Sequence, residues 1–130
     1  MNRKVLLLDA DPAERAALSF SLELEGFDVE SFADCGLLDS RTEPFGSACL
    51  LLDQRLAGAN GLEYLTQLRQ RGVQSPAAVM VTNPTRALQQ LADAATARLI
   101  EKPLLDDALP ALLRELLACG VPIQFTGTPT

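Results

Sequence analysis

Histidine is absent from the 130-residue chain, and cysteine is scarce. Without histidine, zinc sites and the Ser/His and Cys/His catalytic pairs lack their usual components. The three cysteines are an odd number without metal-ligand spacing, which makes a poor disulfide framework; they are Cys35, Cys49 and Cys119. The composition therefore argues against zinc chemistry and against nucleophile–histidine hydrolysis.

Long apolar runs and excess positive charge are also lacking. No apolar run approaches the ~20 residues that span a bilayer. The apolar stretch after Arg3 and Lys4 ends at Asp9, too early for the core of a signal peptide. The net charge of −6 argues against a nucleic-acid surface, which requires a basic patch. We therefore expect a cytoplasmic protein with no membrane contact and no direct nucleic-acid binding.

The chain does have enough apolar residues for a core. Its 48% hydrophobic content and length of 130 residues are typical of one compact domain. We expect this domain to occupy residues 1–119. Residues 120–130 contain Gly, Pro and Thr in quantity, which favours a flexible tail or linker stub.

Strand and helix patterns alternate along this domain. We expect strands over residues 5–8, 27–32, 48–52, 77–81 and 97–100, and helices over about 12–25, 36–40, 62–72, 86–94 and 106–119. Such alternation predicts an α/β fold, a doubly wound five-stranded parallel sheet of flavodoxin-like type with helices on both faces. The order of the strands does not follow from the sequence.

Two helix starts carry local signals. Asp11 is a candidate N-cap, followed by Pro12 at the first helical position and by Glu14 three residues after the cap. Pro110 falls in the first turn of the last helix, where its missing N–H costs little.

Carboxylates follow two of the apolar runs. Asp9 ends the first strand candidate, and Asp53 ends the run Leu50–Leu52 before a turn that contains glycine. Because parallel strands share one carboxyl edge, where ligands bind, we expect the two acids to lie close together. Two carboxylates there suit a hard divalent cation, and one of them could accept a phosphoryl group.

Four segments in this order resemble the receiver domain of bacterial two-component response regulators. They are Val5–Asp9, Leu50–Asp53 with the loop 55–61, Met80–Thr82 and Glu101–Pro103. The resemblance covers nearly the whole chain. It implies a domain that signals through its own phosphorylation and has no independent enzymatic turnover.

The resemblance also implies roles for individual residues. Asp53 would be the phosphoacceptor, Thr82 would hydrogen-bond the phosphoryl oxygens, and Lys102 would pair with them. Asp9, Asp53 and the backbone carbonyl of Arg55 would hold Mg²⁺, with Asp11 as an additional candidate ligand. Lys102 would be joined to the following proline by a cis peptide bond.

The implied partners are a sensor histidine kinase or phosphotransfer protein, and a homodimer is a further candidate assembly. The implied function is two-component signal transduction, in which phosphorylated Asp53 regulates a partner or an output domain.

The site departs from the family pattern at several positions. Ala10 stands where the family has a second acid that ligates the metal, so we expect weak Mg²⁺ binding. Leu99 replaces a usual aromatic residue that moves inward on phosphorylation. The segment between Thr82 and Lys102 is shortened, and Ala57 replaces a proline.

Two other functions stay open. The chain could be a pseudo-receiver, a docking or dimerisation module that works without phosphorylation. It could also be a phosphohydrolase resembling the haloacid dehalogenase group, with Asp9 and Asp11 as its acids, although this hypothesis leaves Asp53 unexplained. Thr82, taken alone, could simply cap the helix after Pro84.

Overall fold

The computed structural model describes residues 3–104 and 106–119. Its main sheet has five parallel strands in the order β2-β1-β3-β6-β7. Their bounds are Lys4–Leu8 (β1), Asp28–Phe32 (β2), Cys49–Asp53 (β3), Ala77–Val81 (β6) and Arg98–Glu101 (β7). The predicted doubly wound α/β fold is confirmed, and the structure adds the strand order.

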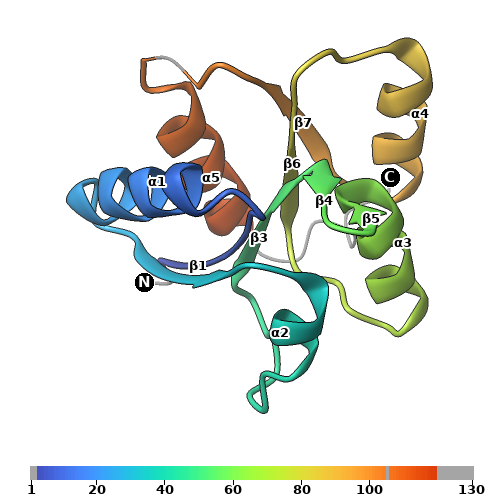
Figure 1. Cartoon of the computed structure of the whole chain (residues 1–130), viewed down its shortest axis with the longest axis horizontal. Helices are drawn as coiled ribbons and strands as arrows, with labels where there is room; N and C mark the ends of the chain where they lie inside the picture. Colours follow the sequence, from blue (N-terminus) through green and yellow to red (C-terminus); the bar gives the residue numbers. More distant parts are fainter. Residues whose placement is uncertain (1–2, 105, 120–130) are drawn as a thin grey trace.

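Helices cover both faces of this sheet (Figure 1). One face carries α1 (Pro12–Leu24) and α5 (Ala108–Cys119), and the other carries α2 (Cys35–Asp39), α3 (Gly61–Gln70) and α4 (Arg86–Ala94). Side chains alternate across a strand, so β1 sends Leu6 and Leu8 to one core and Leu7 to the other. The fully buried strands thereby fix both helical layers against one sheet.

The burial of each strand follows its place in the sheet. Every residue of β3, which lies in the middle, is buried. The edge strand β2 has only exposed and partly buried positions, as expected of an outer strand. The continuous apolar run before Asp53 is therefore the sequence of a central strand.

Some boundaries differ from those expected. Helix α5 begins at Ala108 and not at Asp106, and Pro110 still lies in its first turn. The two-residue strands β4 (Arg55–Leu56) and β5 (Ala59–Asn60) were not predicted, because two residues are too few to show a period. The expected tail over 120–130 lies outside the described residues.

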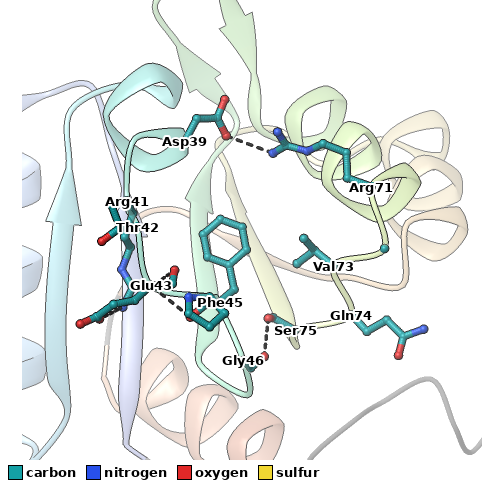
Figure 2. Close-up of a pocket in the computed structure, with 12 residues that line it drawn as sticks. Asp39, Arg41, Thr42, Glu43, Phe45, Gly46, Arg71, Val73, Gln74 and Ser75 are labelled. Atoms are coloured by element: carbon teal, nitrogen blue, oxygen red, sulfur yellow. Dashed lines mark hydrogen bonds and ion pairs between the residues drawn. The ribbon is translucent and has the colours of Figure 1, made fainter.

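An open cavity of about 530 Å³ lies at the amino ends of β3 and β6 (Figure 2). The Ser75 hydroxyl donates to the Gly46 carbonyl across it at 2.7 Å. Arg71 Nη2 lies 3.0 Å from Asp39 Oδ1 at its rim. These contacts hold the loop before β3 in place, at the end of the sheet opposite to Asp53.

Gly61 begins α3 directly beside the end of β3. A Cβ atom on Gly61 would lie 2.5 Å from the Asp53 carbonyl oxygen, closer than Cβ atoms in real structures approach a non-bonded atom. The Gly61 amide donates to the Gln54 carbonyl at 3.1 Å. Space, rather than backbone conformation, therefore requires glycine here.

We expect Gly61→Ala to lower the free energy of unfolding by about 1–3 kcal/mol, because overpacking displaces backbone. Urea unfolding measures this loss, and amide NMR signals of Asp53 and Gln54 should move. Gly58→Ala is the control for the NMR measurement: its φ of +74° makes alanine strained, but no atom lies near its added Cβ, so stability should fall without a shift of the Asp53 signal. Unmoved Asp53 signals in Gly61→Ala would contradict the prediction.

Candidate functional site

The carboxyl edge of the sheet brings the two predicted acids together. Asp53 is the last residue of β3, and Asp9 follows directly after β1. Leu8 pairs with Leu52 in the register, so the two acids leave neighbouring strands at the same level. Asp9 is fully buried and Asp53 is 5% exposed. The expected proximity of Asp9 and Asp53 is present in the structure.

Lys102 lies at the end of β7 and contacts two acids. Its ammonium nitrogen lies 3.1 Å from Asp53 Oδ1 and 3.1 Å from Glu14 Oε1. Burial lowers the pKa of Lys102, but hydrogen bonds to Asp53 and Glu14 outweigh it, so the pKa is raised. The lysine therefore stays charged between the two carboxylates. The peptide bond from Lys102 to Pro103 is cis, as the resemblance implied.

Glu14 was not among the predicted site residues. One oxygen each from Asp9, Glu14 and Asp53 lie within 4.8 Å of one another. The sequence placed Glu14 correctly in the first turn of α1, but its position there suggested a capping role. The contact with Lys102, which is 88 residues away along the chain, leaves no local signal.

Asp9 is the most deeply buried of the three acids. Its Oδ1 accepts from the Asp11 amide at 3.0 Å. Its Oδ2 is buried and has no hydrogen-bond partner among the described residues. Burial, first, and the neighbouring Glu14 together raise the pKa of Asp9 to about 7. Among the described residues, a charged Asp9 is therefore compensated at Oδ1 by the Asp11 amide but not at Oδ2.

The remaining predicted residues border an open cavity of about 500 Å³ at this edge. Its walls comprise Ala10, Asp11, Glu14, Asp53, Arg55, Thr82 and Lys102. Thr82 follows β6 and is exposed. It does not cap the next helix, since Thr85 accepts from the Leu88 amide at 3.1 Å and so caps α4.

Asp11 is engaged as the N-cap of α1. Its Oδ1 accepts from the amides of Ala13 at 2.9 Å and Glu14 at 3.4 Å. The predicted cap is confirmed. The Asp11 side chain would have to give up this capping interaction to reach a metal ion at the carboxyl edge of the sheet.

The acidic group fits a small hard cation. Carboxylate oxygens are the preferred ligands of Mg²⁺, and opposite ligands at 2.0–2.1 Å lie roughly 4 Å apart. The three oxygens within 4.8 Å need only a small inward movement. Asp9 Oδ2 is buried without a hydrogen-bond partner in the described part of the chain, so a bound cation would compensate its charge.

Comparison with known proteins agrees with this geometry. Residues 5–114 match the model of the response regulator receiver domain family. The chain belongs to this family of two-component signalling domains.

Individual relatives include the transcriptional regulatory protein FixJ of Azorhizobium caulinodans, which is 31% identical over 114 residues. That alignment covers 87% of this chain and 54% of FixJ. The solved full-length FixJ from B. japonicum has a TM-score of 0.80 at 26% identity, over 91% of this chain and 59% of that one.

A CheY-like receiver domain from Methanospirillum hungatei has a TM-score of 0.78 at 24% identity and covers 91% of this chain and 95% of its own. It supports the fold alone. The chain spans about half the length of the FixJ relatives that it matches.

The family match argues against the hypothesis of a dehalogenase-like phosphohydrolase.

None of the described helices is long and apolar enough to cross a membrane.

We expect Asp9→Asn to stabilise the metal-free protein at pH 8. The folded-state pKa of Asp9, about 7, exceeds its ordinary value of 3.8, so folding is penalised increasingly as the pH rises through this window. Asparagine carries no charge and keeps the acceptor for the Asp11 amide. The gain should be about 1–4 kcal/mol at pH 8 and should fall below about 1 kcal/mol near pH 4.

Urea unfolding with a chelator present measures both values. Asp11→Asn is the matched control, because asparagine caps a helix as well as aspartate does. A gain at pH 8 that persists unchanged at pH 4 would contradict the assigned cause.

Proposed function

We propose that this receiver domain accepts a phosphoryl group on Asp53 from a sensor histidine kinase or phosphotransfer protein. The phosphorylated domain would then regulate a partner or an output domain. The observation that carries the proposal is the position of Asp53, at the end of the central strand and on an open cavity, with the Lys102 ammonium 3.1 Å from Oδ1.

In the proposed reaction, an Asp53 oxygen attacks the phosphorus of a phosphohistidine. The new O–P bond forms as the N–P bond breaks, and the imidazole nitrogen keeps the electron pair of that bond. Charge spreads over the equatorial phosphoryl oxygens in such a transition state. The Lys102 ammonium would neutralise part of this charge, and the Thr82 hydroxyl would donate to a phosphoryl oxygen.

Metal binding is part of this proposal. Asp9, Asp53 and the backbone carbonyl of Arg55 would hold a Mg²⁺ ion, and Asp11 could join them only by leaving its cap. The ion would supply positive charge to the phosphoryl oxygens. Ala10 offers no ligand atom at the position of the family's second acid.

We expect Asp53→Asn to abolish phosphorylation by a small phosphodonor with Mg²⁺. Asparagine keeps the size of the side chain and removes the nucleophilic carboxylate. Intact mass spectrometry should find one labile phosphoryl adduct on the unmodified chain and none on the variant. Asp39→Asn is the control, because Asp39 lies at the opposite end of the sheet. An adduct that survives in Asp53→Asn would refute the proposal.

A second candidate is a docking module that works without phosphorylation. Leu99 on β7 lacks the aromatic ring that reports the phosphorylated state in the family, and it packs against the core. Leu91 on the neighbouring α4 is 55% exposed, an apolar side chain available to a partner or to a second copy. The face of α4, β7 and α5 would then be a constant contact surface.

We expect this face to respond little to phosphorylation, because Leu99 has no aromatic ring to change position between two states. A ligand shifts a conformational equilibrium only by its differential affinity for the two states. The measurement is the amide chemical shifts of α4, β7 and α5 with and without a phosphoryl mimic and Mg²⁺. Shifts near Asp53 serve as the positive control for binding. Large concerted shifts across the face would restore an ordinary phosphorylation switch.

A further inference from the structure

Glu14 has an unusual set of contacts for its helix position. It is the third residue of α1, where an acid commonly accepts from the amide of the N-cap residue. Here the Asp11 amide donates instead to Asp9 Oδ1 at 3.0 Å. Glu14 accepts from Lys102 at 3.1 and 3.2 Å. Its carboxylate is therefore directed to the site rather than to the helix end.

The shared ammonium places Glu14 opposite Asp53. Lys102 contacts both acids at 3.1 Å, so the two carboxylates are separated by a single cationic group. Asp9 completes the acidic group, with all three oxygens within 4.8 Å. A cation already lies between these acids in the metal-free protein.

This group has more negative charge than its neighbours compensate. The group contains three carboxylates and one ammonium, and if all are ionised two negative charges remain, equal in magnitude to the charge of one Mg²⁺ ion. Asp9 Oδ2 is buried and unpartnered within the described residues. The family's second acid is missing at Ala10, whereas Glu14 lines the same cavity as Ala10.

We propose that Glu14 is a Mg²⁺ ligand that replaces the acid missing at position 10. Glu14 would bind the ion together with Asp9, Asp53 and the backbone carbonyl of Arg55, and Lys102 would keep Asp53 as its partner. The inference rests on the proposed function, because it assigns a further ligand to the same site.

The first test is calorimetric titration of the full chain with Mg²⁺, in the absence of a phosphodonor. We expect Glu14→Gln to weaken binding by roughly tenfold or more, since a charged ligand contact is lost. Glu63→Gln is the matched control: Glu63 is the third residue of α3, is exposed, and should leave the affinity unchanged. Equal Mg²⁺ affinities of the unmodified protein and Glu14→Gln would overturn the proposal. Absence of Mg²⁺ binding by the unmodified protein would overturn it too.

A rescue variant tests the replacement itself. In the double variant Ala10→Asp with Glu14→Gln, the acid returns to the family's position. We expect this variant to recover the affinity that Glu14→Gln loses. Failure to recover, with a folded protein by circular dichroism, would overturn the claim that Glu14 stands in for that acid.

The rival explanation is that Glu14 only holds Lys102. Glu14→Gln would then alter Mg²⁺ binding indirectly, by releasing the ammonium toward Asp53. The background Lys102→Gln removes this route. We expect Glu14→Gln to weaken Mg²⁺ binding in that background too, and equal affinities there would establish the rival.

Failure of this inference is distinguishable from failure of the proposed function. Metal affinity is measured without phosphorylation, whereas the Asp53→Asn experiment detects the phosphoryl adduct. Mg²⁺ binding through Glu14 without any adduct would refute only the function. An adduct at Asp53 with no effect of Glu14→Gln on Mg²⁺ binding would refute only the ligand.

Discussion

Repulsion among three carboxylates at one sheet edge is the constraint on which this site depends. Asp9, Glu14 and Asp53 are held together by elements that are fixed elsewhere: two central strands and a helix packed on the sheet. The compensating group among the described side chains is the ammonium of Lys102, which reaches two of the acids. Core burial of the strands therefore provides the free energy that keeps like charges close, and a divalent cation would relieve the repulsion.

Most of the fold follows from local pattern because each central strand is a short apolar run that ends in a polar residue or is followed directly by one. The run before Asp53 predicts a central strand, and the alternation in β2 predicts an edge. Strand order did not follow, since apolar runs contain no information about which neighbour each strand pairs with. The short strands β4 and β5 escaped prediction for a different reason, because two residues define no period.

The site was predictable where chemistry follows directly from position on the sheet. Asp9 and Asp53 end parallel strands, so their meeting required only the parallel arrangement. Glu14 was missed because its helix position has a familiar local role, and nothing nearby in the sequence indicates that Asp9 takes over that role. A side-chain acceptor two residues before the N-cap frees the helix acid. This exchange of partners is tertiary information, although it involves residues only five positions apart.

This exchange of hydrogen-bond partners also explains how an acid on α1 can replace an acid in the loop after β1. An acid at position 10 would lie in the loop just after β1, whereas Glu14 is fixed by the first turn of α1. That turn is anchored by the Asp11 cap, and Arg15 in the same turn donates to the Asp9 carbonyl at 2.8 Å. Cap, acid and guanidinium thus couple the start of the helix to the end of the strand. A glutamate side chain is longer than an aspartate and loses more rotamer freedom when it is held. Glu14 therefore needs a cationic partner to stay ordered, and in the metal-free protein Lys102 is that partner.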